Sequence, residues 1–221
     1  MDTGVVIEFD FAAVNGAEVL FAAAKKFLKD LDGIKLDAPS EVRYLAGNAY
    51  QDGFAKLFAS VKTKKTAPKA ARDFTAAFAS ALTQALPETL SPACRNFIKA
   101  LTDKGVKAVI ATRAPLDAVS ALFGFVPPEK IAFYQEKSAV YGTCSWDSWR
   151  RACHEAQLNY KATVAVTGSG FGVKTALHAG MGSVAVVNDH VAYQDFGGAD
   201  DVIAELSGKT AKNVLKALRI P

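Results

Sequence analysis

The stretch Val5-Val6-Ile7-Glu8-Phe9-Asp10-Phe11, close to the start of the chain, decides how the fold is interpreted. Its apolar run predicts a buried strand over residues 4–10 that ends in two acidic residues. Because residues at i and i+2 of a strand share one face, Glu8 and Asp10 are expected to point together beyond its carboxyl end. Open parallel sheets bind their ligands at that edge. The two acidic side chains are therefore the first candidates for a functional site.

Composition places the chain in a broad class. It has 221 residues, 50% of them hydrophobic, which suits one core domain with a modest insertion. Its apolar runs stay below the roughly 18–20 residues that a membrane span needs, so no membrane partner is expected. The first residues lack the pattern of a signal peptide, and Cys94, Cys144 and Cys153 show no metal-ligand spacing. These features predict a cytoplasmic protein.

A cluster of basic residues supplies much of the formal net charge of +4; it consists of Lys62, Lys64, Lys65, Lys69 and Arg72. Such a cluster could contact nucleic acid or an acidic partner. No aromatic residues interleave with these charges, however, so a solvated segment between helices is the preferred interpretation. Nucleic acid is therefore not expected as a partner.

The order of expected elements indicates an α/β fold. Helical patterns fill the region up to Pro87, and helices alternate with strands from Ser91 onward. Helices are expected at 16–30, 40–60, 69–86, 92–104, 115–123, 145–158, 171–179, 200–206 and 211–218. Further strands are expected at 106–112, 130–134, 163–167 and 183–187. Repeated β–α units predict a parallel sheet with helices on both faces, and the three helices after the first strand are expected to be an insertion.

Two further strand ends carry candidate residues. The strand at 106–112 ends in Thr112, and Arg113 follows with a guanidinium group that can hold phosphate through two hydrogen bonds. An alternative role for Thr112 is to cap the helix that begins at Pro115. Lys137 lies in the loop after the strand at 130–134, where a single lysine is ordinarily solvated.

A glycine-rich turn, Gly168-Ser169-Gly170-Phe171-Gly172, lies between an expected strand and an expected helix. Backbone N–H groups in such a turn can bind an anion, which makes Gly168, Ser169 and Gly170 candidate ligand-binding residues. The same spacing occurs in dinucleotide-binding sites. Here only one expected strand follows the turn, so binding of a phosphate or sulfate group is preferred over binding of NAD.

Taken together, these motifs resemble the haloacid dehalogenase-like (HAD) superfamily, in the branch with a helical cap, as in β-phosphoglucomutase-like proteins. Periodicity alone would also allow a Rossmann or flavodoxin-like domain. The resemblance implies a Rossmannoid core of residues 1–14 and 89–221 and a helical cap of residues 15–88. In the superfamily's first motif, Asp-x-Asp-Gly, the nucleophile is replaced here by Glu8 and the glycine by Phe11. Asp10 matches the general acid and base; its alternative role is that of a turn carboxylate.

The same resemblance assigns roles to the other motifs. It implies that Thr112 and the following backbone N–H hold a phosphate oxygen, and that Lys137 is the superfamily's lysine. Thr167 and Gly168 stand where the superfamily has the acids that bind Mg²⁺. The Mg²⁺ site is therefore expected to be lost, and no cofactor is expected. Lys137, or less favourably Lys174, is expected to pair with Glu8 or Asp10 in place of the metal.

The resemblance, and the positions at which the chain departs from it, lead to two candidate functions. The first is a non-catalytic protein of HAD type that binds a small phosphorylated ligand or a protein partner, because the motifs depart from the superfamily at positions 8, 11, 167 and 168. The alternative is a divergent hydrolase that acts on a small phosphorylated substrate through Asp10, Thr112 and Lys137. The sequence contains no motif that identifies a substrate.

Overall fold

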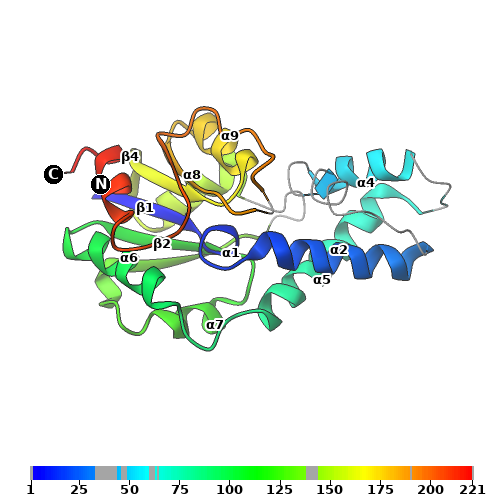
Figure 1. Ribbon diagram of the computed structural model, residues 1–221, viewed down its shortest axis with the longest axis horizontal. Coiled ribbons are helices and arrows are strands. Elements are labelled where there is room, and N and C mark those ends of the chain that lie inside the picture. Colours follow the sequence, from blue (N-terminus) through cyan, green and yellow to red (C-terminus); the bar gives the residue numbers. More distant parts are fainter. Residues whose placement is uncertain are drawn as a thin grey trace.

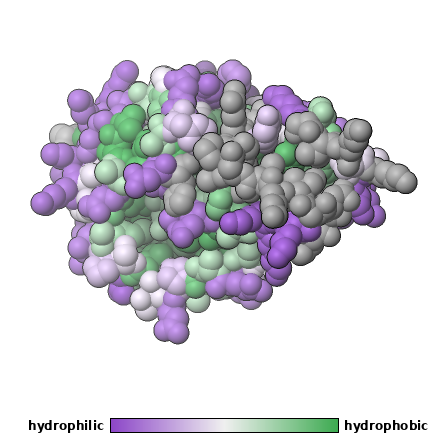
Figure 2. All heavy atoms as spheres, turned by 45° about the vertical axis from the view of Figure 1, so that its right-hand side comes forward, coloured by the Kyte–Doolittle hydropathy of each residue, from purple (hydrophilic) through white to green (hydrophobic). Residues whose placement is uncertain are grey.

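The computed structural model describes residues 2–32, 44–45, 49–59, 63, 65–137, 144–189 and 191–220. Figure 1 shows a sheet domain at one end of the molecule and a group of helices at the other. Figure 2 shows hydrophilic residues spread over the face it presents, between smaller hydrophobic areas. In the part of the chain described, no helix is both long enough and apolar enough to cross a membrane.

A parallel sheet of six strands, in the order β3-β2-β1-β4-β5-β6, forms the centre of the sheet domain. The strands are β1 (Asp2–Glu8), β2 (Lys107–Thr112), β3 (Ile131–Gln135), β4 (Leu158–Thr167), β5 (Gly182–Val186) and β6 (Asp201–Ile203). β1 lies between β2 and β4, so its carboxyl end is in the middle of the sheet edge. The predicted α/β fold with a parallel sheet is confirmed.

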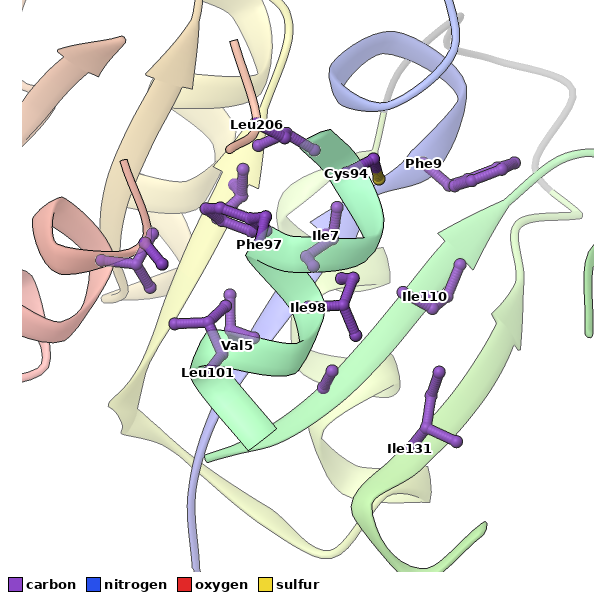
Figure 3. Packing of buried hydrophobic residues seen from close by; sticks show 14 of the residues in the cluster. Val5, Ile7, Phe9, Cys94, Phe97, Ile98, Leu101, Ile110, Ile131 and Leu206 are labelled. Atoms are coloured by element: carbon purple, nitrogen blue, oxygen red, sulfur yellow. The ribbon is translucent and has the colours of Figure 1, made fainter. Parts of the chain in front are cut away.

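Successive side chains of each strand point to opposite faces of the sheet. Apolar side chains lie on both faces, and helices cover both. On one face, α6 (Pro92–Asp103) packs Phe97 and Ile98 against residues such as Ile7, as Figure 3 shows. On the other face, α8 (Trp146–Glu155) packs Trp149 into the cluster that contains Val6. The remaining helical segments of this domain are α1 (Phe9–Ala12), α7 (Leu116–Ser120), η1 (Ala121–Phe123), η2 (Pro128–Lys130), α9 (Gly170–Ala179) and α10 (Ala211–Ala217).

The segment between β1 and α6 forms a helical unit, called the cap below, with α2 (Gly16–Asp32), α4 (Tyr50–Ala59) and α5 (Ala67–Gln84). Its centre is aromatic: the Phe74 ring lies 5.1–5.6 Å, centroid to centroid, from the rings of Tyr50, Phe27 and Phe54. The three helical patterns of this region are thus present. Part of the helix expected at 40–60 lies outside the described residues, and the exact domain limits of 15–88 stay a prediction.

One expected element is wrong. The pattern at 200–206 predicts a helix, but Asp201–Ile203 forms β6, which pairs with β5 through Val184↔Asp201 and its two neighbours. A segment of three residues at a sheet edge is too short to show the two-residue period of a strand. The Ser183 N–H donates to the Asp200 carboxylate, which helps to hold the strand in register.

The basic cluster is solvated where the structure describes it. Lys65, Lys69 and Arg72 are exposed at the start of α5, whereas Lys62 and Lys64 lie outside the described residues. Exposed charges beside a helix are consistent with the preferred interpretation of this cluster. The absence of nucleic acid as a partner stays a prediction.

Candidate functional site at the carboxyl ends of β1, β2 and β4

Glu8 and Asp10 are both buried at the carboxyl end of β1, with 2% and 4% of their surfaces exposed. They do not share a strand, however. β1 ends at Glu8 and the chain turns at once into the short helix α1, which carries Asp10. The two carboxyl groups therefore meet through a turn, and the strand argument for their convergence is wrong.

The Asp10 carboxylate binds two donors at the end of β2. The Thr112 hydroxyl donates to Oδ1 over 2.6 Å, and the Arg113 backbone N–H donates to Oδ2 over 2.7 Å. Thr112 Oγ1 also accepts the N–H of Ala114 over 3.0 Å. We call the Thr112 hydroxyl and the Arg113 N–H the donor pair. These are the groups that the resemblance assigns to a phosphate oxygen, and here they hold a carboxylate of the same chain.

The Glu8 carboxylate binds a separate set of donors. Its Oε1 accepts the backbone N–H of Cys144 over 2.9 Å, and its Oε2 accepts the Thr167 hydroxyl over 2.5 Å. The backbone of Gly168 also acts to lower the pKa of Glu8. Thr167, at a position where the resemblance implies an acid, thus binds the side chain of Glu8.

Burial dominates the ionisation of both carboxyl groups. It raises the pKa of Glu8 to about 7, although the Thr167 hydroxyl and the Cys144 N–H lower it, and the Asp10 charge raises it further. Burial also raises the pKa of Asp10, against the opposing effects of the Thr112 hydroxyl, the Arg113 N–H and the Arg113 charge. A carboxyl group with a pKa near 7 is protonated in about half of the molecules at neutral pH.

The glycine-rich turn has its backbone donors engaged within the protein. The Ser169 N–H lies 3.3 Å from Thr167 Oγ1, and the Gly170 N–H donates to the side chain of Gln194 over 2.8 Å. The Gly172 N–H donates to Ser169 Oγ over 2.9 Å, which caps α9. Anion binding by Gly168, Ser169 and Gly170 therefore stays a prediction, and it would require these groups to exchange partners.

The expected pairing of a lysine with Glu8 or Asp10 is wrong. Lys137 is exposed and, within the described residues, forms no ion pair with either carboxylate. Lys174 Nζ lies 3.3 Å from Asp195 instead. Arg113, which is 93% buried, supplies positive charge beside Asp10. A buried guanidinium stays charged at any physiological pH, so it can serve this role without a metal.

Three residues of this site were not predicted from the sequence. Cys144 contributes its backbone N–H, and buried Glu136 lines a cavity with the two carboxylates. Tyr50, from the cap helix α4, is fully buried, and its hydroxyl has no hydrogen-bond partner in the described part of the chain. Burial raises the pKa of Tyr50; the Arg113 charge lowers it, and the charges of Asp10 and Glu8 raise it further. None of the three belongs to a recognisable motif.

The free space at the site is small. The cavity has a volume of about 10 Å³ and is lined by Glu8, Asp10, Ala111, Thr112, Arg113, Glu136 and Cys144. This is close to the space that one water molecule requires. A phosphate group, with five heavy atoms, does not fit beside the carboxylates in this arrangement.

Comparisons with known proteins address the fold. At the level of sequence, neither a model of a protein family nor a curated protein matches the chain. CbbY from Rhodobacter sphaeroides, solved in complex with phosphate, is 20% identical with a TM-score of 0.70, over 97% of this chain and 99% of that chain. A HAD hydrolase of family IA, variant 3, from Entamoeba histolytica is 16% identical with a TM-score of 0.70, over 99% and 100%. β-Phosphoglucomutase from Clostridium difficile is 13% identical with a TM-score of 0.67, over 99% and 98%.

These likenesses, together with the parallel sheet and the helices inserted after β1, show the class: the chain has the fold of the haloacid dehalogenase-like superfamily. More particularly, it has the form of that fold in which a unit of helices is inserted after the first strand. The predicted resemblance is confirmed at the level of fold.

The Mg²⁺ ion that this fold implies does not fit the side chains present. Thr167 and Gly168 stand where the resemblance implies acids, and a Cβ atom at Gly168 would lie 2.2 Å from the carbonyl oxygen of Phe11. The carboxylates of Glu8 and Asp10 already accept protein hydrogen bonds. Mg²⁺ demands near-octahedral oxygen ligands, and no group of three or more His, Cys, Asp or Glu residues in the described ranges could hold a metal ion.

Proposed function

We propose that this protein is a non-catalytic member of its fold class, which binds a small phosphorylated ligand or a protein partner and does not carry out Mg²⁺-dependent phosphotransfer. One observation carries the proposal. The donor pair, which would hold a phosphate oxygen, is bound to the carboxylate of Asp10 at 2.6 and 2.7 Å. Hydrogen bonds to an ionised group are shorter and stronger than neutral ones, so an incoming phosphate competes with an internal anion for its own ligands.

The chemistry expected of Glu8 supports the same proposal. A carboxyl group attacks phosphorus only as the carboxylate, and burial raises the pKa of Glu8 to about 7. Both of its oxygens also accept hydrogen bonds, from Cys144 and Thr167. Compared with an aspartate, its reacting oxygens lie one methylene further from the backbone. A displacement of about 1 Å can lower a rate roughly 10²-fold.

Charge balance is a further argument. A phosphate placed here would lie beside the carboxyl groups of Glu8 and Asp10, and Mg²⁺ normally offsets such repulsion while it polarises the phosphoryl group. Neither Thr167 nor Gly168 offers a carboxylate that could hold that ion. Arg113 alone does not offset a phosphate and two carboxylates. Turnover is therefore expected to be negligible.

The three cysteines are free and buried, which supports the proposed cytoplasmic location. Disulfides persist mainly in oxidising compartments, and thiols are the usual state in the cytoplasm.

A divergent hydrolase is the second candidate, and one observation favours it. A carboxyl group whose pKa is near 7 is well placed to give and take a proton at neutral pH. In that case Glu8 or Asp10 would act as a general acid and base, and Thr112 would bind the substrate after Asp10 has moved away.

A phosphatase assay separates the two candidates. We would measure hydrolysis of generic phosphomonoesters during an Mg²⁺ titration, for the wild type and for the double variant Glu8→Gln, Asp10→Asn. The matched control replaces two exposed acids near the opposite end of the strands, Asp103→Asn with Glu129→Gln. The proposal predicts equal background rates for all three proteins. A wild-type rate well above that of the Glu8/Asp10 variant, and equal to that of the control, would establish the hydrolase instead.

A further inference from the structure

The short helix α1 connects the site to the cap. Asp10 points to the donor pair of β2, and the next residue, Phe11, points into the aromatic centre of the cap. Phe11 is 97% buried, and its ring centroid lies 6.1 Å from that of Phe78 in α5. One turn of chain therefore carries both the internal carboxylate and an anchor of the cap.

The backbone of this turn is held between two glycines. A Cβ atom at Gly16, the first residue of α2, would lie 2.1 Å from the carbonyl oxygen of Asp10. A Cβ atom at Gly168 would lie 2.2 Å from the carbonyl oxygen of Phe11. Glycine at both positions lets the backbone of the turn pack closely against the start of α2 and the end of β4, which leaves the turn little freedom to shift while the cap and β4 stay in place.

The Asp10 side chain also lacks room to rotate away. The cavity beside it has a volume of about 10 Å³ and is lined by Glu8, Arg113, Glu136 and other residues. A tetrahedral oxyanion is several times larger than the one water that this space accommodates. For an oxyanion to reach the donor pair, both the carboxylate and the turn that carries it must move.

We propose that oxyanion binding at the donor pair and packing of Phe11 in the cap exclude one another. A phosphate group on a small ligand then displaces the Asp10 carboxylate, draws Phe11 out of the cap core and loosens the cap. Phe11 acts as a positioning residue in this coupling. The inference rests on the proposed function, because it describes how a ligand is bound without being turned over.

Inorganic phosphate is a suitable probe, and its affinity tests the competition. Calorimetric titration would compare the wild type with Asp10→Ala, which removes the competing carboxylate, and with Glu8→Gln, which removes a neighbouring charge but leaves the donor pair occupied. We expect Asp10→Ala to bind phosphate at least tenfold more tightly than either other protein. An equal gain in phosphate affinity in Asp10→Ala and Glu8→Gln would mean that charge repulsion alone limits binding, and would overturn the proposal. The absence of phosphate binding by Asp10→Ala would also overturn it.

Hydrogen–deuterium exchange in α5 tests the coupling to the cap. In the wild type, added phosphate is expected to speed amide exchange around Phe74 and Phe78. In Asp10→Ala the same degree of saturation should cause a much smaller increase, because no carboxylate has to leave. Unchanged exchange in the phosphate-saturated wild type would overturn the proposal.

Substitutions at Phe11 give a second test of the coupling. Phe11→Ala should bind phosphate at least tenfold more tightly than the wild type. Phe11→Leu keeps an apolar contact, so its affinity for phosphate should lie between those of Phe11→Ala and the wild type. Equal affinity in the wild type and Phe11→Leu, with a folded cap in both, would contradict the coupling. Inorganic phosphate cannot be hydrolysed, so these readouts are independent of the phosphatase assay: turnover would refute the proposed function while leaving the competition measurable.

Discussion

The carboxyl group of Glu8 is buried between two segments of the chain, and accepts hydrogen bonds from the Cys144 N–H in one and from the Thr167 hydroxyl in the other. Backbone N–H groups cannot reverse their polarity, so they favour the ionised form, whereas burial favours the neutral form. Burial is the larger effect and brings the pKa to about 7. Glu8 is therefore a group whose charge depends on pH close to neutrality.

The stability of the wild type should depend on this ionisation. The pKa of Glu8 is raised from 4.5 to about 7 on folding, so its contribution is complete below about pH 4.5 and is lost as the pH rises to about 7. Relative to Glu8→Gln, the wild type is expected to lose on the order of 3 kcal/mol of unfolding free energy over this window. Denaturant titrations at several pH values measure the difference. A difference between wild type and Glu8→Gln that stays constant with pH would contradict the assignment.

The sequence predicts that the site residues lie at strand ends, but it does not predict their hydrogen-bond partners. Glu8, Asp10, Thr112 and Arg113 follow apolar runs, and the ends of parallel strands meet at one edge of a sheet. The bond between Asp10 and the donor pair depends on the turn that begins after Glu8, which no spacing rule indicates. Tyr50 sits on an apolar helical stripe and cannot be told from an ordinary core residue by its pattern.

Among the elements, α1 depends most on its neighbours. It has only four residues, so its own hydrogen bonds contribute little, and its position comes from packing against Gly168 and the cap. The sequence analysis assigned the turn to the end of a strand because short helices carry no periodic signal. The longer helices α2, α5, α6 and α9 could be predicted because several turns repeat their apolar spacing.

Gly168→Ala tests the position of α1. The added methyl group would lie 2.2 Å from the Phe11 carbonyl oxygen, so the turn must move or the protein must strain. We expect a loss of about 1–3 kcal/mol in unfolding free energy, as for other overpacked sites. Gly124→Ala is the matched control, since a Cβ there meets nothing within 4 Å and its φ is −58°. Equal stability of the two variants would show that α1 does not pack against Gly168. The same clash predicts that Gly168→Asp, with Glu8→Asp, does not by itself restore a metal site.

In the whole molecule, two hydrophobic cores meet at the site. The sheet domain and the cap each have their own cluster, and the cap cluster is completed by Phe11 and Val191 from the sheet domain. Burying an aromatic side chain such as Phe11 stabilises this contact by about 1.5–3 kcal/mol. The inserted cap could be predicted from the helices that follow the first strand. Its attachment through Phe11 could not be predicted. In the sequence, Phe11 is noticeable only because the resemblance implies a glycine at that position.

Nuclear magnetic resonance of the Arg113 backbone amide tests most directly whether the chain's own carboxylate occupies the phosphate-binding groups. Inorganic phosphate would be added to the wild-type protein at neutral pH while the amide signals of Arg113 and of α5 are followed. Because the Arg113 N–H is bound to Asp10 over 2.7 Å, its signal should stay unchanged until phosphate is high enough to change the signals of α5 as well. A saturable shift of the Arg113 signal at low phosphate, with the α5 signals unmoved, would contradict the account.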